Sequence, residues 1–288
     1  RPGESPGSGR QRERLRAAAA PLAALARRHA LVLTHGNGPQ IGWLANREGA
    51  AALDELGAES EGWLGYLIEQ ELAPLLAGRE IATLLTQVEV DPADPAFRAP
   101  SKPIGPLVDE GEAERLRRER GWHFAPSGRG RFAPSGGRLR RVVPSPEPVR
   151  IRELGAIAHL VAAGVIVICA GGGGVPVVAG ADGSLRGVEA VVDKDRSAAL
   201  LAEALDADAL LLLTDVDAVY DDWPDATRPI RRAAPAELRA RRFEPGSMGP
   251  KVEAACRFAE RTGRPAYVGA LDAAEALLAG AAGTCVAP

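Results

Sequence analysis

Lysine is rare in this chain, and its few positions are informative. Of the 35 basic residues only Lys102, Lys194 and Lys251 are lysines, and the rest are arginines. A lysine ammonium is a compact, mobile charge, whereas the arginine guanidinium is a planar fork. A lysine kept in an arginine-rich chain therefore indicates a site that needs a point charge. Chance retention on a solvated face is the alternative for any one of them.

Lys194 stands between two carboxylates, Asp193 and Asp195. Exposed to solvent, this triplet would be an ordinary surface charge cluster. Beside a polyphosphate, Lys194 could instead neutralise charge in a phosphoryl-transfer transition state while Asp195 fixes its direction. Lys251 follows the loop 246–250, which opens a predicted helix over 252–261, so its ammonium and the loop amides could bind phosphate oxygens.

Two glycine segments could bind small anions. Four glycines, 171–174, allow main-chain N–H groups to approach an anion closely, with a tight turn as the alternative. They do not fit a dinucleotide fingerprint, because Pro176 stands where Gly or Ala is required. Asn37 lies between Gly36 and Gly38 and offers two donors and an acceptor to a planar carboxylate-like or carbamoyl-like ligand. A left-handed turn is the alternative for Asn37.

A third candidate segment follows the apolar run 209–214. It holds Asp215, Asp217 and Tyr220, which could bind the edge or face of a nucleotide. Core packing is the alternative for Tyr220.

Short apolar runs and helical segments alternate along the chain and would position these residues. The runs 30–34, 161–170 and 209–214 are predicted strands, while 11–28 and 197–205 have helical character. This alternation predicts an α/β fold with a parallel sheet covered on both faces. Ligands of such sheets bind at the carboxyl ends of the strands, where the candidate loops stand.

The segment 91–148 breaks this alternation. It is dense in proline and brackets a charged helix-like stretch over 110–120. Prolines at this density do not build a central strand, so we predict an inserted lid on the main body.

Composition excludes several classes of function. The formal net charge is −3, so the chain lacks the basic field that nonspecific nucleic-acid binding needs. The longest apolar runs are too short to span a membrane. The three cysteines form no CxxC pair, which favours neither disulfides nor structural zinc and fits a reducing cytoplasm. We expect no protein-bound metal site.

Several segments, collinear along the chain, resemble those of the carbamate kinases, a branch of the amino acid kinase family. They are THGNGPQIG (34–42), TQVEVDPADPAF (86–97), SKPIGP (101–106), RRVVPSPEP (140–148), CAGGGGVPVV (169–178), GVEAVVDKD (187–195), LLLTDVDAVY (211–220) and GSMGPKVEAA (246–255). The proline-rich segments at 101–106 and 140–148 are characteristic of carbamate kinases rather than of the wider family. All three lysines fall inside the matching segments.

The resemblance implies a fold and a reaction. The fold is a single amino acid kinase domain over 1–288, a three-layer α/β/α sandwich around a mainly parallel eight-stranded sheet, with the lid at 91–148 and a homodimeric state. The reaction is reversible phosphoryl transfer between carbamoyl phosphate and ADP, giving ATP and carbamate, which decomposes to ammonia and CO2. Such an enzyme is a phosphotransferase acting on a carboxyl group, works with Mg²⁺ and ATP or ADP, and serves arginine metabolism in the cytoplasm.

The resemblance also implies roles for particular residues. Lys194 and Lys251 would stabilise the moving phosphoryl group, Asp195 would orient a lysine, and Lys102 would enter from the lid. The residues implied to bind carbamate or the phosphoryl group are Gly36, Asn37, Gly38, Gly171, Gly172 and Gly173. Those implied to lie along the nucleotide are Asp215, Asp217, Tyr220, Met248 and Gly249.

Two alternatives to this function are open at this point. Carbamate kinases begin with a strand and a GGNA-type glycine loop, which we expect to be missing here. A catalytically impaired or non-catalytic nucleotide-binding relative is therefore the first alternative. The second is another family kinase, acting on acetylglutamate or aspartate, which the segment 101–106 disfavours.

Overall fold

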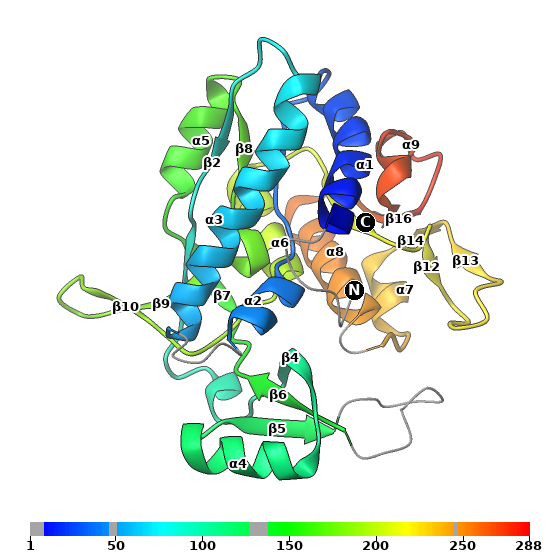
Figure 1. The fold of residues 1–288 in the computed structure, drawn as a ribbon. Helices are drawn as coiled ribbons and strands as arrows, with labels where there is room; N and C mark the ends of the chain where they lie inside the picture. Colours follow the sequence, from blue (N-terminus) through cyan, green and yellow to red (C-terminus); the bar gives the residue numbers. More distant parts are fainter. Residues whose placement is uncertain (1–8, 46–50, 127–137, 245–246) are drawn as a thin grey trace.

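Parallel strands form the centre of the body in the computed structural model, which describes residues 9–45, 51–126, 138–244 and 247–288 (Figure 1). One sheet has the order β1-β8-β2, with all pairs parallel; its strands are β1 (Val32–Leu33), β8 (Ile166–Ile168) and β2 (Ile81–Thr83). A second has the order β11-β15-β16-β14; its strands are β11 (Leu210–Thr214), β15 (Ala266–Ala270), β16 (Thr284–Val286) and β14 (Arg232–Ala233). In this second sheet only the β15–β16 pair is antiparallel.

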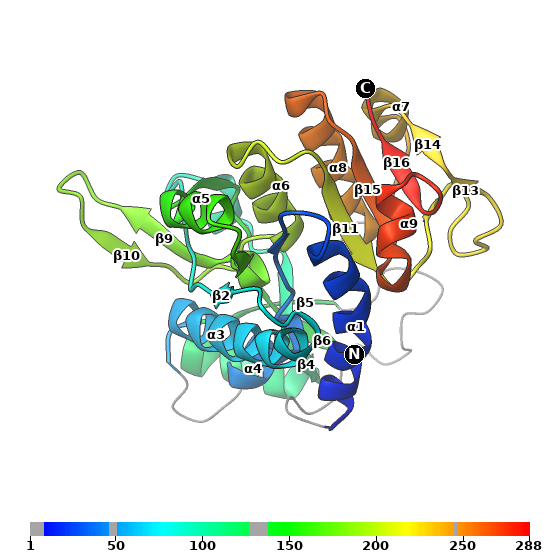
Figure 2. The ribbon, with the colours of Figure 1, turned by 90° about the horizontal axis from the view of Figure 1, so that it is seen from above.

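Helices cover both faces of these strands, as Figure 2 shows. One layer holds α1 (Gly9–Ala26), α3 (Leu53–Leu72) and α9 (Ala274–Leu278). The other holds α5 (Leu154–Ala162), α6 (Lys194–Ala204) and α8 (Met248–Thr262), with α7 (Pro235–Arg239) packed on α8. The predicted three-layer α/β/α fold is therefore confirmed. The described strands do not form one eight-stranded sheet, however, because no hydrogen-bonded pair joins β1 to β11.

Two smaller sheets extend from the body. The first has the order β10-β9-β3-β7, and its β9–β10 hairpin projects outward (Figure 1). Its strands are β3 (Gln87–Val90), β7 (Pro148–Ile151), β9 (Val175–Ala179) and β10 (Leu185–Gly187). The second is a hairpin of β12 (Val219–Tyr220) and β13 (Pro229–Ile230).

The apolar run 161–170 is shorter as a strand than its sequence predicts. Only 166–168 form β8, and residues 161–162 end helix α5 instead. Gly164 has a φ of +84°, which glycine adopts at no steric cost and which ends the helix. The apolar residues before Gly164 therefore pack from a helix, and those after it from a strand. The strand 210–214 matches its prediction closely. Helix α6 begins at Lys194, three residues before the predicted 197–205, because Asp193 caps it.

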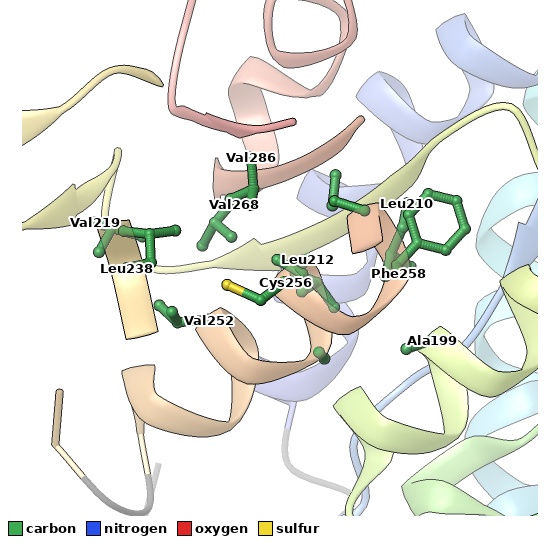
Figure 3. Packing of buried hydrophobic residues seen from close by; sticks show 14 of the residues in the cluster. Ala199, Leu210, Leu212, Val219, Leu238, Val252, Cys256, Phe258, Val268 and Val286 are labelled. Atoms are coloured by element: carbon green, nitrogen blue, oxygen red, sulfur yellow. The ribbon is translucent and has the colours of Figure 1, made fainter. Parts of the chain in front are cut away.

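The core that holds the predicted phosphate-binding helices lies between α6, α8 and the strands β11 and β15 (Figure 3). Phe258 of α8 is completely buried there, beside Leu210 and in the same cluster as Val268. Burying a side chain of this size contributes roughly 1.5–3 kcal/mol. This packing fixes the two helices whose first turns carry Lys194 and Lys251.

The segments 102–126 and 138–143 form a separate small unit below the body (Figure 1). An antiparallel sheet of order β4-β6-β5 carries one helix; the elements are β4 (Lys102–Val108), α4 (Glu110–Arg120), β5 (His123–Pro126) and β6 (Leu139–Val143). Asp109 caps α4 by accepting the N–H of Glu112 at 2.8 Å, so the helix begins where the sequence predicts. Residues 127–137 of the predicted lid lie outside the described part of the chain.

This unit contacts the body through α2 (Gly38–Leu44). A Cβ atom on Gly42 would lie 2.6 Å from the N atom of Gly105, so the two backbones approach closely.

None of the described helices is long and apolar enough to span a membrane.

Candidate active site

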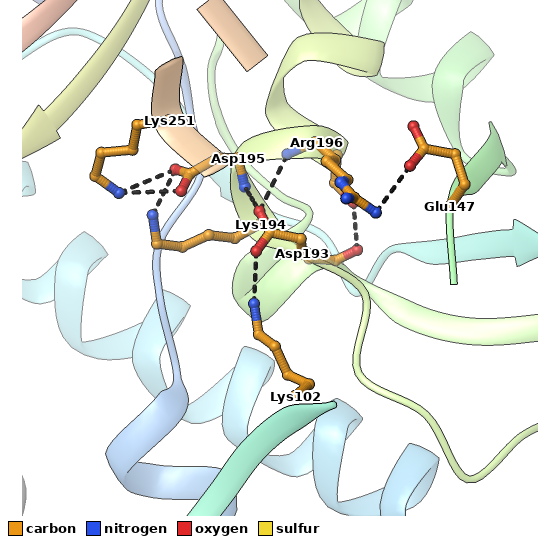
Figure 4. A network of polar contacts seen from close by, with 9 residues as sticks. Lys102, Glu147, Asp193, Lys194, Asp195, Arg196 and Lys251 are labelled. Atoms are coloured by element: carbon orange, nitrogen blue, oxygen red, sulfur yellow. Dashed lines mark hydrogen bonds and ion pairs between the residues drawn. The ribbon is translucent and has the colours of Figure 1, made fainter. Parts of the chain in front are cut away.

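Two lysines share one carboxylate at the first turns of α6 and α8 (Figure 4). Lys194 Nζ lies 2.6 Å from Asp195 Oδ1, and Lys251 Nζ lies 3.0 Å from Asp195 Oδ2. Asp195 is 6% exposed and the Lys251 side chain 12%, whereas the Lys194 side chain is 37% exposed. The triplet is therefore no solvated surface cluster, because its carboxylates are buried. Lys194 is the member that reaches solvent.

The pKa values of the two lysines shift in opposite directions. Burial opposes the charged form of Lys194, but the neighbouring Asp195 raises the pKa of its ammonium above the ordinary value. Burial, together with the positive charge of Lys194, lowers the pKa of Lys251. Two ammonium groups around one carboxylate leave an excess of positive charge, which suits binding of a phosphate.

Lys102 comes from the lid and contacts the other carboxylate of the triplet. Its Nζ lies 2.5 Å from Asp193 Oδ2. The second oxygen of Asp193 accepts the N–H of Asp195 at 2.9 Å and caps helix α6. Although burial opposes ionisation, Lys102 and the cap hold the pKa of the Asp193 carboxyl below its usual value.

We predict that replacing Asp193 separates these two roles. Asp193→Ala removes the cap and the ion pair and should lower the free energy of unfolding by about 1 kcal/mol or more, while Asp193→Asn keeps a good cap. Because the folded-state pKa of Asp193 is depressed, its ion pair stabilises the fold above the unfolded pKa of about 3.9, and this is lost as pH falls further. Denaturant unfolding of the three proteins at pH 7 and pH 3.5 checks this. Equal stability of the two variants at pH 7 would contradict the capping role.

The predicted glycine segments lie against Lys194 and against each other. A Cβ atom on Gly36 would lie 3.3 Å from Lys194 Cδ, and one on Gly172 would lie 2.2 Å from Asn37 Nδ2. Asn37 is buried, donates from Nδ2 to Ser60 Oγ at 2.8 Å, and has a φ of −122°. It is therefore not an asparagine in a left-handed turn. The structure brings Lys194, Gly36, Asn37 and Gly172 together.

The N–H groups of the second glycine segment differ from the sequence expectation, because they donate inside the protein. Gly171 donates to Glu61 Oε1 at 2.8 Å, Gly172 to the carbonyl of His35 at 2.6 Å, and Gly173 to the carbonyl of Ala170 at 3.1 Å. These amides are satisfied without a ligand. The lack of side chains in this segment instead lets Asn37 and His35 pack directly against its main chain.

Gly172→Ala should test this use of space. The φ of Gly172 is +69°, and the added methyl group would overlap the Asn37 amide. We expect at least a tenfold loss of activity. A matched control is Gly183→Ala, which also has a positive φ but open space around its Cβ position. Steady-state kinetics of both variants checks this, and equal activities would show that steric closure at Gly172 does not matter.

The predicted nucleotide residues occupy two places. Met248 and Gly249 share the first turn of α8 with Lys251. Asp215 follows β11, and Asp217 accepts a hydrogen bond from Tyr220 Oη at 2.6 Å. Tyr220 is thus not a core residue. Among the described residues, no hydrogen bond links Asp215, Asp217 or Tyr220 to the lysine cluster.

Three residues behind the glycine loop are absent from the sequence prediction. Ser60 binds Asn37, and Glu61 and Thr86 bind the main chain at 170–171. One signal was available for Glu61, because it stands at helical spacing between the buried residues Gly57 and Leu64 of α3. A carboxylate on an apolar helix face needs partners when buried.

Comparisons with known proteins agree with this fold. The model of the amino acid kinase family matches residues 5–270. The carbamate kinase of Haemophilus influenzae is 46% identical over 293 residues, covering 99% of this chain and 92% of that protein. The carbamate kinase of Pyrococcus furiosus is 44% identical, covering 92% of this chain and 87% of that protein. The solved structure of Giardia lamblia carbamate kinase bound to AMP-PNP has a TM-score of 0.85 and 34% identity, covering 99% of this chain and 94% of that one.

The fold and the lysine site define a kinase of the α/β/α type. The chain belongs to the amino acid kinase family and, within it, to the carbamate kinase branch.

Proposed function

We propose that this chain is a carbamate kinase that transfers the phosphoryl group of carbamoyl phosphate to ADP and can run in reverse. The bond between phosphorus and the carbamoyl oxygen breaks, a bond to the terminal oxygen of ADP forms, and carbamate leaves as a carboxylate. The observation that carries this proposal is the pair of ammonium groups on Asp195, facing the Gly36 loop. The named relatives support it.

The lysines supply what this reaction requires. Phosphoryl transfer asks for positioning and for stabilisation of charge on the transferred group, with little covalent work by the protein. Phosphate oxygens would take the place of the Asp195 oxygens as partners of Lys194 and Lys251. Asp195 then acts as an orienting group, because it holds both ammonium groups near one point before substrate arrives.

We propose that Mg²⁺ enters as part of the nucleotide substrate, MgADP or MgATP. In the described part of the chain, no group of three or more His, Cys, Asp or Glu side chains is placed to hold a metal ion. Phosphate oxygens with water are the usual ligands of Mg²⁺ in such complexes. The nucleotide would lie along Met248 and Gly249 and toward Asp215, Asp217 and Tyr220. The AMP-PNP complex of the Giardia relative supports nucleotide binding.

The carbamoyl group would lie between the two glycine segments. We propose that it contacts Asn37 together with Gly36 and Gly38 on one side, and Gly171, Gly172 and Gly173 on the other. Lys102 would approach from the lid, which is held near α6 by the Asp193 ion pair. Lid closure over the substrate would exclude water, which competes with ADP for the phosphoryl group.

We also propose a homodimer that works in the cytoplasm as part of arginine metabolism. Tyr66 of α3 and Leu85 are large, exposed apolar residues, and Leu85 lies 3.6 Å from the Cβ position of Gly62, one turn from Tyr66. Light scattering on the purified protein should give twice the chain mass. Leu85→Glu should lower that mass toward one chain. An unchanged mass would place the interface elsewhere, and a monomeric wild type would exclude the dimer.

A panel of phosphoryl acceptors tests the substrate. ATP consumption would be measured with carbamate, N-acetylglutamate and aspartate at matched concentrations. We expect turnover with carbamate and background rates with the other two. Turnover with an amino acid instead would replace the proposal with a different kinase of the same family.

A further inference from the structure

A buried carboxylate lies directly beneath the glycine loop 170–173. Glu61 is 1% exposed and projects from α3. Its Oε1 accepts the N–H of Gly171 at 2.8 Å, and its Oε2 accepts the N–H of Thr86 at 3.3 Å. Gly171 and Thr86 follow the neighbouring strands β8 and β2. One side chain therefore ties the ends of two strands to a helix of the covering layer.

The rest of the loop is held by two neighbours of Glu61. Thr86 Oγ1 accepts the N–H of Ala170 at 2.8 Å, and the carbonyl of His35 accepts the N–H of Gly172 at 2.6 Å. A Cβ atom on Gly171 would lie 2.3 Å from the His35 ring and 3.0 Å from Glu61 Cγ. The loop thus has no room to shift toward α3 while Glu61 is in place.

The position of this loop determines the position of Asn37. The side-chain amide of Asn37 packs directly against Gly172. It donates a hydrogen bond to Ser60, the residue before Glu61. The loop and Asn37 therefore share one support on α3. Any displacement of the loop would move the groups that we propose to face the carbamoyl end of the substrate.

We propose that Glu61 is a positioning residue that fixes the 170–173 loop and Asn37 for the carbamoyl phosphate end of the reaction, and not for the nucleotide. The inference rests on the proposed carbamate kinase function, but the anchoring itself can be tested without turnover. Removal of a buried acceptor leaves donors unsatisfied, which costs more than the hydrogen bond itself contributes.

The surroundings make this anchor sensitive to pH. Burial raises the pKa of Glu61 to about 7, against the opposing hydrogen bonds from Gly171 and Thr86, and Glu153 at the start of α5 raises it further. Burial lowers the pKa of His35 to about 4 and raises that of the Cys169 thiol to about 12, so both face Glu61 as neutral groups. Nothing positive in this set compensates the carboxylate.

Protonation of Glu61 converts one of its two acceptor oxygens into a donor. Glu61 would then accept from only one of its two partners, Gly171 of the loop and Thr86 after β2, and no longer tie the two together. We expect binding of carbamoyl phosphate to weaken as pH falls through about 7, with little change for ADP.

Two variants and a matched control test the proposal. Glu61→Leu removes both acceptors and should raise KM for carbamoyl phosphate about tenfold or more, with KM for ADP within about twofold. Glu61→Gln keeps one acceptor for Gly171 and cannot ionise, so it should retain most of the affinity at pH 7. Glu153→Gln is the control, because Glu153 holds the N–H of Gln87 at 2.7 Å and does not touch the glycine loop.

The pH dependence supplies a readout that a merely structural role would not move. The ratio of kcat/KM for carbamoyl phosphate between wild type and Glu61→Gln cancels the titration of the substrates. It should rise with pH through about 7. A flat ratio, or an equal rise in both KM values of Glu61→Leu, would overturn the proposal. Because the Gln variant suffices for this comparison, it holds even where the Leu variant does not fold.

Hydrogen exchange separates this inference from the proposed function. In the peptide 169–177, Glu61→Leu should lose protection, whereas Glu61→Gln, which keeps an acceptor for Gly171, and Glu153→Gln should keep most of it. Loss of protection in Glu61→Leu, together with a wild type that makes no ATP, would uphold the anchor and refute the kinase proposal. Unchanged protection in Glu61→Leu would overturn the anchor whatever the activity.

Discussion

Replacing Lys194 with alanine is expected to lower kcat by about 10²–10³-fold and to leave the fold intact. The side chain is 37% exposed and contributes no core packing, so thermal unfolding should change little. It is, however, the most exposed lysine side chain of the charge cluster, and its Cδ and Cε atoms lie against Gly36. Steady-state ATP formation and thermal unfolding of the same preparation provide the two measurements.

Lys194→Arg should not rescue this loss. The planar guanidinium is wider than an ammonium and would have to fit against Gly36, where Lys194 Cδ already lies 3.3 Å from the Cβ position. Arg196→Ala is the matched control, because Arg196 also carries a positive charge on α6 but pairs with Glu147 at 2.9 Å, away from the lysines (Figure 4). Near-normal activity of Lys194→Ala would remove its catalytic assignment.

Asp195→Asn is expected to lower kcat by about 10²-fold and to change its pH dependence. The two ammonium groups would lose the carboxylate that holds them together (Figure 4). Burial and Lys194 already lower the pKa of Lys251, and loss of the Asp195 charge would lower it further. Activity requires the charged lysine, so the alkaline fall of kcat should begin at a lower pH than in wild type.

The control for this experiment is Asp193→Asn. It neutralises the neighbouring carboxylate, which binds Lys102 rather than Lys251. The fall of its kcat at alkaline pH should therefore stay closer to that of wild type. If Asp195→Asn keeps the wild-type alkaline limb, Asp195 does not tune Lys251.

The sequence singled out the charged residues that lie together in the fold, but not the residues that support the glycine loop. Lys194 and Lys251 stand out because lysine is scarce, although the helices that carry them begin at 194 and 248, a few residues before the predicted starts at 197 and 252. Glu61 could not be assigned in the same way, because α3 carries several acidic residues and only tertiary packing decides which one is buried. The direction of the Gly171 and Gly172 amides likewise depends on partners distant in sequence.

The segment 161–170 shows a second limit of the sequence. Its apolar residues satisfy a strand and a buried helix end equally well, and the turn at Gly164 separates the two. The lid helix 110–120 was predictable to the residue, because its start and end are set locally by Asp109 and Gly121. Capping residues close in sequence thus determine where this helix begins and ends. Contacts between residues distant in sequence determine how the site is supported.

The most direct test of the account is ATP formation from ADP, Mg²⁺ and carbamoyl phosphate by this 288-residue chain. We predict sustained ATP synthesis that requires carbamoyl phosphate and is lost in Lys194→Ala. No ATP, with ADP still bound, would contradict the account and identify a nucleotide-binding relative without turnover.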